Sequence, residues 1–250
     1  MRLKDKVIIV TGGANGIGRT YCESLVSEGA KVLVADIDRN NAAALAEELN
    51  RRAGHQCAAA TGVDVTSEDD TEKMVGTAME NFQRVDVLIN NVGTYPHVEF
   101  EKISYQAWRQ VVTVNLDSVF LCSKAVLPQM KKQRTGKIIN ITTNLVWIGL
   151  AGMVHYVAAK AGIVGFTRSL AREIGEYGIT VNAVAPGAVI PEGVPDEVSR
   201  MRMEMIVNYQ CVKRPERATD LVGAVIFLAS SDSDFISGQL LTVDGGLTNH

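Results

Sequence analysis

The stretch "KVIIVTGGANGIG", residues 6–18, indicates how the chain begins to fold. An apolar, β-branched run typical of a buried strand leads directly into a turn with glycines at positions 12, 16 and 18. The next segment, "RTYCESLVSEGA", has the spacing of a helix. Glycine permits backbone torsions that are closed to other residues, and a helix N-terminus offers unpaired N–H groups. The stretch therefore predicts a strand, an anion-binding turn and a helix, with an ordinary tight turn as the alternative.

Further short apolar runs follow, and segments long enough for a helix separate them. This alternation is the pattern of βαβ units in a parallel sheet. Several runs are apolar nearly throughout, as expected where helices cover both faces of the sheet. We therefore predict an α/β fold with a doubly wound parallel sheet of about seven strands, formed by residues 6–11, 31–36, 57–65, 85–91, 136–142, 178–185 and 239–246.

No linker, repeat or low-complexity segment interrupts this pattern, so we expect a single domain over residues 1–250. The irregular region is 187–214, which carries prolines and then a methionine-rich helical segment. We expect this region to form a lid.

Composition and charge argue against several classes of partner. The net charge is −3, and no basic run is longer than the two lysines at 131–132, so neither nucleic acid nor an anionic membrane is expected. The N-terminal apolar run is too short for a signal peptide or a spanning helix, which favours a cytoplasmic protein. The cysteines and histidines lack metal-binding spacing; we expect no metal site and four buried free thiols.

The glycine turn suits the pyrophosphate of a dinucleotide, because a strand precedes it and a helix follows it. The second strand ends at Asp36, near the spacing at which a carboxylate meets the adenosine ribose. Such a carboxylate binds the 2′-hydroxyl and repels a 2′-phosphate. The sequence therefore favours NAD over NADP, although Arg19 and Arg39 lie close enough in sequence to pair with a phosphate. A merely solvated Asp36 is the alternative.

Tyr156 and Lys160 lie four residues apart in the helical segment "YVAAK" and therefore on one helix face. A tyrosine with an ordinary pKa of about 10 is a weak base at neutral pH, and a nearby ammonium lowers that pKa. Together the two side chains make a general acid/base pair. The spacing is also common by chance, so taken alone it leaves a structural role open.

Other landmarks surround this pair in a fixed order: "TGGANGIG" (11–18), "DV" (64–65), "NNVG" (90–93), "VN" (114–115), "VNAVAPG" (181–187) and "ISGQLLTVDGG" (236–246). In these segments, and over essentially its whole length, the chain resembles the short-chain dehydrogenase/reductase family. Its "GTYP" (93–96) and "WI" (147–148) stretches are similar to NAD-dependent secondary-alcohol dehydrogenases of the 1-phenylethanol dehydrogenase type. The resemblance implies a Rossmann-type dinucleotide-binding fold, an oxidoreductase activity with NAD and a homotetramer.

By this resemblance Tyr156 exchanges a proton with the substrate oxygen, Lys160 lowers the tyrosine pKa and holds the nicotinamide ribose, and Asn115 holds a water in the proton relay. Thr143 stands at the position of the family's usual serine; it keeps the hydroxyl but adds a methyl group that narrows the pocket. Thr142 and Asn144 are further candidates for this contact. The residues that resemble the family's cofactor site are Gly12, Asn15, Gly16, Ile17, Gly18, Asp36, Ile37, Asp64, Val65, Asn91, Gly93, Pro186, Gly187 and Val189, with Tyr156 and Lys160.

Pro191 stands where the family often has a threonine that contacts the nicotinamide amide, so we expect main-chain groups such as those of Val189 to hold the amide.

Aromatic and apolar side chains follow the strand ends at which ligands bind in open α/β sheets, and we expect a substrate pocket lined by Tyr95, Leu145, Trp147 and Met153. The methionines of 201–205 either form an adaptable apolar surface or pack their segment onto the domain. The predicted activity is hydride transfer between NAD and a small secondary or cyclic alcohol or ketone of apolar or aromatic character. The alternatives are an NADPH-dependent 3-oxoacyl reductase and a non-catalytic cofactor-binding protein of the same fold.

Overall fold

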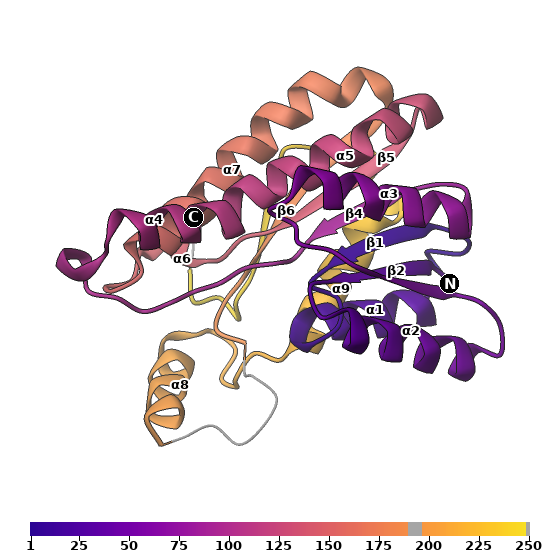
Figure 1. Ribbon diagram of the computed structural model, residues 1–250. Coiled ribbons are helices and arrows are strands. Elements are labelled where there is room, and N and C mark those ends of the chain that lie inside the picture. Colours follow the sequence, from indigo (N-terminus) through magenta and orange to yellow (C-terminus); the bar gives the residue numbers. More distant parts are fainter. Residues whose placement is uncertain (190–196, 249–250) are drawn as a thin grey trace.

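The computed structural model describes residues 1–189 and 197–248, apart from the side chains of 197–200 and 202. In this part of the chain seven parallel strands form one sheet in the order β3-β2-β1-β4-β5-β6-β7 (Figure 1). The strands are β1 (Val7–Thr11), β2 (Lys31–Asp36), β3 (Ala58–Gly62), β4 (Val87–Asn90), β5 (Gly136–Ile141), β6 (Ile179–Pro186) and β7 (Leu240–Val243). Each strand falls in a predicted segment to within one residue at the ends of that segment, and the predicted doubly wound α/β fold is confirmed.

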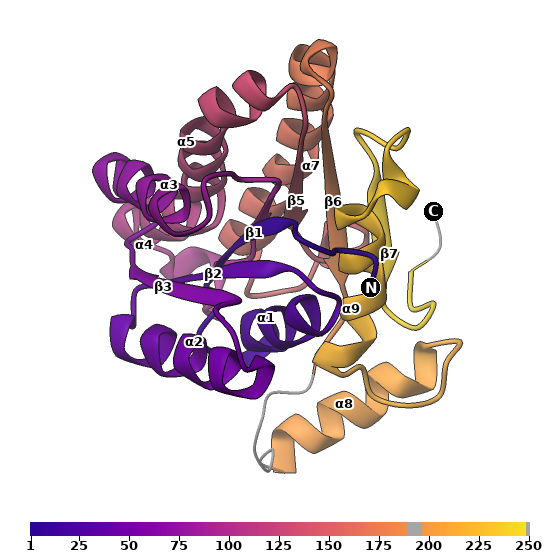
Figure 2. The same cartoon turned by 90° about the vertical axis from the view of Figure 1, so that its right-hand side faces the viewer.

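Helices cover both faces of the sheet (Figure 2). Helices α1, α2 and α9 pack on one face, and α3, α5 and α7 pack on the other. The helices are α1 (Gly16–Ser27), α2 (Arg39–Ala53), α3 (Glu68–Phe82), α4 (Tyr105–Val112), α5 (Ser118–Gln133), α6 (Leu145–Ile148), α7 (Val154–Ile174), α8 (Glu197–Tyr209) and α9 (Ala218–Ala229), with a π-helical turn at Thr113–Asp117 and 3-10 turns at Phe100–Lys102, Gly175–Tyr177 and Ser231–Ser233.

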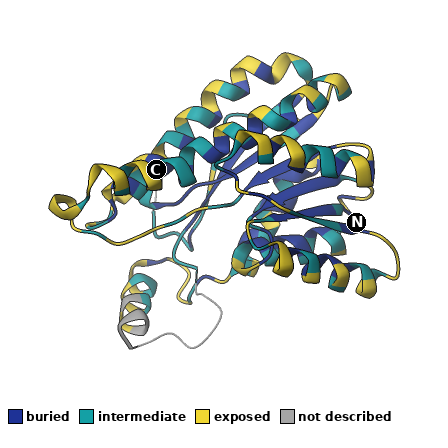
Figure 3. Cartoon of the chain, in the orientation of Figure 1, coloured by how far each residue is buried: buried dark blue, intermediate teal, exposed yellow. Residues whose placement is uncertain are grey.

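Alternate residues of β1 enter two separate cores. Ile8 and Val10 contact the core under α1, α2 and α9, whereas Ile9 contacts the core under α3, α5 and α7. Because both faces are covered, the five inner strands are buried along nearly their whole length, whereas the edge strands β3 and β7 are partly exposed (Figure 3). This explains why the strand runs are apolar throughout.

Side chains fix several helix starts. The Asp38 carboxylate accepts a hydrogen bond from the Asn41 N–H at 3.0 Å, and the Ser104 hydroxyl accepts one from the Ala107 N–H at 3.1 Å. These caps satisfy N–H groups that a helix leaves unpaired in its first turn. Helix α2 ends at Gly54, whose φ of +73° is the left-handed conformation that glycine adopts without strain.

The helical run Tyr105–Gln133 is, by length and composition, long and apolar enough to cross a membrane. It consists of α4, the π-helical turn and α5. In the structure α5 packs against α3, and α4 and the π-helical turn pack against α7. This run thus forms part of the helix layer above the sheet.

The segment 187–214, predicted to be a lid, lies partly outside the described residues. Helix α8 stands apart from the layered body of sheet and helices (Figure 2). Met201 and Met205 on this helix are each 61% exposed, so these two methionines do not pack the segment onto the domain. Cys211, just after α8, is also exposed; the expectation of a buried thiol is wrong for this residue, whereas Cys22, Cys57 and Cys122 are buried.

A buried chain of hydrogen bonds joins the central strands to the helices that carry the site. The Asn90 amide donates to Asn140 Oδ1 at 2.9 Å and to Ser123 Oγ at 3.2 Å, and Asn140 Nδ2 donates to Thr167 Oγ1 at 2.9 Å. Asn140 is fully buried. Its amide therefore links β4 and β5 to α7.

Replacing Asn140 with leucine is expected to destabilise the fold by about 2–4 kcal/mol, because buried groups on Asn90 and Thr167 lose their partner. Urea unfolding followed by circular dichroism measures the change. The exposed Asn81→Leu on α3 is the matched control, with an expected change of at most about 0.5 kcal/mol. Equal stability of both variants would show that the buried chain adds nothing.

Candidate active site

The glycine turn after β1 forms a cradle at the carboxyl edge of the sheet. Gly12 and Gly16 have φ values of +62° and +53°, and a Cβ atom added at Gly18 would lie 1.9 Å from the carbonyl oxygen of Gly12. Helix α1 begins after Asn15, whose side chain makes no capping hydrogen bond, and its first turn holds no acidic residue. The first N–H groups of α1 are thus left for an anion. These features fit the pyrophosphate of a dinucleotide; Ile17, also predicted here, lies half-buried in the same turn.

Asn91, at the end of β4, holds this cradle in place. Its Nδ2 donates to the carbonyl oxygens of Thr11 and Gly12 at 3.1 and 3.2 Å, and its main-chain N–H donates to Thr11 Oγ1 at 3.0 Å. Strands β1 and β4 are neighbours at the point where the strand order reverses. The predicted turn and the predicted loop thus meet at the position where open α/β sheets bind ligands.

Asp36 ends β2 beside the cradle. Its Oδ2 accepts a hydrogen bond from the Ala14 N–H and its Oδ1 accepts one from the Asp38 N–H, each at 3.0 Å. The carboxylate is therefore ordered by main-chain donors and is not merely solvated. Ile37, the next residue, is 77% exposed.

The two arginines close in sequence to the cradle, Arg19 and Arg39, differ in their contacts. Arg19 donates to Glu23 at 3.1 Å and to Glu48 at 2.7 Å. The side-chain carbons of Arg39 lie against Gly62, at 3.1–3.3 Å from where a Cβ of that glycine would be. Arg19 is thus paired with two carboxylates, whereas the Arg39 guanidinium, exposed at the start of α2, has no ion pair with the described residues.

Asp64 and Val65 follow β3. The Asp64 carboxylate accepts hydrogen bonds from the N–H and hydroxyl of Thr66 at 2.9 and 2.6 Å, and these donors lower its pKa. Val65 is buried. The pair shapes the turn into α3 at the same edge of the sheet as Asp36.

Tyr156 and Lys160 lie on α7, as the four-residue spacing predicts. The Lys160 ammonium is buried, donates to the Ile141 carbonyl at 2.8 Å and lies 6.0 Å from the centre of the Tyr156 ring. Burial lowers the pKa of Lys160 to about 8. Burial also raises the pKa of Tyr156 to about 12, and a hydrogen bond with the Thr143 side chain offsets part of that rise. The expected lowering of the tyrosine pKa by Lys160 is not seen in this geometry, where burial sets the direction of the shift.

Thr143 is buried beside Tyr156, as the spacing predicts. The two neighbouring candidates have other partners. The Thr142 hydroxyl donates to the Lys160 carbonyl at 2.8 Å, and the Asn144 amide donates to Asp244 Oδ2 at 3.1 Å. Of these three side chains, Thr143 is the one that acts on the pKa of the tyrosine.

Asn115 lies in the π-helical turn and is fully buried. Its Nδ2 donates to the carbonyls of Thr94 and Val111, each at 2.9 Å, and its Oδ1 accepts from the Thr94 N–H at 3.2 Å. Both amide hydrogens are thus used inside the protein. A Cβ added at Gly93 would lie 2.9 Å from Asn115 Oδ1 and 3.2 Å from Lys160 Nζ, so Gly93 separates these two side chains.

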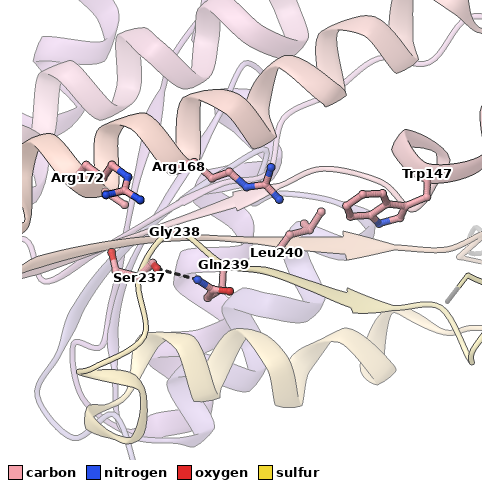
Figure 4. Close-up of a pocket in the computed structure, with 8 residues that line it drawn as sticks. Trp147, Arg168, Arg172, Ser237, Gly238, Gln239 and Leu240 are labelled. Atoms are coloured by element: carbon pink, nitrogen blue, oxygen red, sulfur yellow. Dashed lines mark hydrogen bonds between the residues drawn. The ribbon is translucent and has the colours of Figure 1, made fainter. Parts of the chain in front are cut away.

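The predicted substrate wall is partly assembled around the tyrosine. The rings of Tyr95 and Tyr156 meet edge to face with centres 6.2 Å apart. Leu145 is half-buried at the start of α6, and Met153 is buried just before α7. Trp147 lies at one end of a cavity of about 650 Å³ between α7 and β7, beside Arg168 and Leu240 (Figure 4).

A model of the short chain dehydrogenase family matches residues 6–200. The chain belongs to this family. Two relatives are each 36% identical to this chain: the (2S)-[(R)-hydroxy(phenyl)methyl]succinyl-CoA dehydrogenase subunit BbsD of Thauera aromatica, over 246 residues, and a 3-oxoacyl-[acyl-carrier-protein] reductase of Synechocystis, over 247 residues. Each alignment covers 98% of both chains. A solved structure provisionally described as a short-chain alcohol dehydrogenase, from Sinorhizobium meliloti, is 27% identical with a TM-score of 0.92 and covers 98% of this chain and 97% of that one.

In this short-chain dehydrogenase the loop after β6 faces a second carboxylate that the sequence did not single out. Pro186 is buried and ends β6, and Val189 forms an isolated parallel bridge with Glu216. A Cβ added at Gly187 would lie 2.6 Å from Glu216 Oε2. No spacing rule pointed to Glu216, because its contact with the loop depends on how the chain returns after α8. Pro191 lies outside the described residues.

Proposed function

We propose that this protein is an NAD-dependent dehydrogenase that oxidises a small secondary or cyclic alcohol of apolar or aromatic character, and reduces the corresponding ketone in the reverse direction. The observation that carries the proposal is the grouping of Tyr156, Thr143 and Lys160 beside the cradle, with the buried Thr143 side chain next to Tyr156 and the Lys160 ammonium 6.0 Å from the centre of the tyrosine ring. A non-catalytic role would not require a hydroxyl pair held above a buried ammonium.

Each residue of the site has a separate role in the oxidation of an alcohol. A bound nicotinamide supplies the acceptor for the hydride that leaves the carbinol carbon. Tyr156, as the phenolate, takes the hydroxyl proton, and Thr143 orients the same oxygen through a hydrogen bond. The positive charge of Lys160 favours the phenolate and is available to the nicotinamide ribose. Because both Asn115 amide hydrogens are used, a relay water is held by an oxygen of Asn115.

NAD is favoured over NADP by the carboxylate at the end of β2. Asp36 is fixed by two main-chain donors, and its negative charge opposes a 2′-phosphate. Arg19 is held by Glu23 and Glu48 and does not offset that charge.

Replacing Asp36 with asparagine keeps an acceptor for the Ala14 N–H and removes the charge. We expect the preference for NAD over NADP to shift toward NADP by at least about tenfold, which is about 1.4 kcal/mol. Titration calorimetry with both oxidised cofactors measures the two dissociation constants. Asp69→Asn, an exposed site on α3, is the charge-matched control. An unchanged preference in Asp36→Asn would remove Asp36 from cofactor selection.

The substrate class follows from the wall around the tyrosine. Tyr95, Leu145 and Met153 bring aromatic and apolar surface to this region, with Trp147 as a further wall residue by prediction. The name of the Thauera relative describes a succinyl-CoA thioester that carries a secondary benzylic alcohol, and it is the alcohol group that belongs to the proposed class. Initial rates with NAD and NADP across aryl, cyclic and aliphatic secondary alcohols test this. Activity with NAD and aryl or cyclic alcohols is expected; a rate confined to NADP would contradict the proposal.

A 3-oxoacyl reductase that uses NADPH is the second candidate, because the Synechocystis relative carries that activity in its name. Reduction of a 3-oxoacyl thioester, followed with NADPH and NADH side by side, separates the two. A rate far above the alcohol rates, with NADPH preferred, would favour this candidate. The fixed Asp36 carboxylate argues against it.

We further propose a cytoplasmic homotetramer of single-domain subunits in which the 187–214 segment covers the substrate. Interfaces at α7 and β7 would enclose the cavity between them and cover Leu241, which is 38% exposed. Light scattering after size-exclusion chromatography measures the oligomeric state.

A further inference from the structure

Glu216 is a buried carboxyl group that the proposed chemistry does not use. It is 5% exposed, and neither of its oxygens has a hydrogen-bond partner among the described residues. Its backbone bridges to Val189, so it sits against the loop that follows β6. A buried acid without a partner is costly when ionised, and its position therefore calls for an explanation.

The carboxyl group of Glu216 touches the rear of Gly187. The space that a Gly187 Cβ would occupy is 2.6 Å from Glu216 Oε2 and 3.0 Å from Asp244 Cβ. The main-chain N–H of Gly187 donates to the Val243 carbonyl at 3.1 Å, so this donor is already occupied. Glu216 thus lies directly behind a residue of the predicted nicotinamide loop, separated from the cofactor side by one glycine.

Three charged groups act on Glu216: Asp244, Asp220 and Arg214. The side chain of Asp244, after β7, accepts hydrogen bonds from the Asn144 amide and from the N–H and hydroxyl of Thr248. Burial raises the pKa of Glu216 to about 7; the charges of Asp244 and Asp220 add to the rise and the charge of Arg214 opposes it.

On the α1 side the group that faces Glu216 is the buried hydroxyl of Tyr21, which also has no partner among the described residues. Burial and the nearby Glu216 raise the pKa of Tyr21, so this hydroxyl stays protonated at neutral pH. Of the groups named around Glu216, Arg214 is the one that carries a positive charge. A cation arriving at the loop would therefore have a strong effect on the protonation of Glu216.

We propose that Glu216 is a positioning residue for the 187–189 loop and that its carboxyl group releases a proton to solvent when oxidised cofactor binds there. The inference rests on the proposed function, which places the nicotinamide beside this loop. The oxidised nicotinamide ring is a cation and the reduced ring is neutral. A carboxylate behind the loop therefore favours NAD over NADH, and the protonated acid does not.

The direction of the pH dependence follows from this linkage. Below the pKa of Glu216, near 7, the group is neutral and must lose its proton before it can favour the cation. As pH rises through 7, a growing fraction of Glu216 is already ionised before NAD binds, so the affinity for NAD rises. The affinity levels off once the group is fully ionised. The affinity for NADH has no such dependence on Glu216. Each unit by which bound NAD lowers the pKa corresponds to about tenfold in affinity between low and high pH.

Titration calorimetry at pH 7, in two buffers of different ionisation enthalpy, counts the protons released on binding. With wild-type protein and NAD we expect a net release of protons that includes a contribution from Glu216, because its raised pKa leaves part of the population protonated at that pH. Glu216→Gln should lose this contribution, and Glu80→Gln, an exposed site on α3, should keep it. Any proton release from Lys160 occurs in both variants, so a difference in proton release between them is due to Glu216.

A second measurement needs no variant and remains available if Glu216→Gln does not fold: NAD and NADH affinities of the wild-type protein from pH 6 to 8. The ratio of NAD to NADH affinity should rise severalfold over this range. Equal proton release by wild type and Glu216→Gln, or a constant affinity ratio, would overturn the inference alone. Failure of the wild-type protein to bind either cofactor would overturn the proposed function and the inference with it.

Discussion

Replacing Tyr156 with phenylalanine is expected to lower the turnover of alcohol oxidation by about 10²–10⁴-fold while leaving NAD binding nearly unchanged. The substitution removes the hydroxyl that accepts the substrate proton and that bonds to Thr143. It keeps the ring that packs against Tyr95. The loss should therefore fall on the turnover number and not on the dissociation constant for NAD.

Initial rates and calorimetric NAD binding, measured on the same preparation, check this expectation. Tyr105→Phe is the matched control, because that side chain is 79% exposed on α4 and its hydroxyl should contribute nothing to turnover. A Tyr156→Phe protein with wild-type turnover would remove the acid/base assignment. It would also leave the Thr143 hydrogen bond without a catalytic purpose.

Replacing Gly18 with alanine is expected to weaken NAD binding by at least about a hundredfold, or about 2.7 kcal/mol. An alanine Cβ would lie 1.9 Å from the Gly12 carbonyl oxygen and 2.9 Å from Asn91 Nδ2. Since no side-chain rotation relieves a backbone clash, α1 and the glycine turn must separate. The N–H groups that face the pyrophosphate then move out of position.

Titration of each variant with NAD measures this loss. Gly76→Ala on α3 is the control, because a Cβ there meets nothing within 4 Å. Alanine in a helix interior should even stabilise the fold slightly. Normal NAD binding by Gly18→Ala would show that the cofactor does not rest on this turn.

The strands and the glycine turn could be predicted from the sequence because their causes are local. A run such as "VIIVT" is apolar on both faces, and that requires helices above and below it. The pairing of Tyr156 with Lys160 is equally local, since four residues make about one helical turn. Thr143 could also be expected near this pair, because the end of its strand and the start of the helix lie at the same edge of the sheet.

The features that could not be predicted from the sequence depend on contacts between distant segments. The Asn115 amide donates to the carbonyls of Thr94 and Val111 because the residue lies in a π-helical turn that directs its side chain inward. No residue pattern in the sequence predicts that turn. The burial that raises the Tyr156 pKa comes from the whole fold around it. Glu216 reaches the 187–189 loop after the chain has passed through α8 and returned.

The most direct test of the central claim is transfer of deuterium from the carbinol carbon of a labelled secondary alcohol to NAD. Representative aryl, cyclic and aliphatic alcohols, each carrying deuterium on that carbon, are incubated with the protein and NAD, and the reduced cofactor is analysed by mass spectrometry. We predict labelled NADH with the aryl or cyclic alcohol, and almost none with the Tyr156→Phe protein. Absence of labelled NADH with all three alcohols, while NAD still binds, would contradict the proposed hydride transfer.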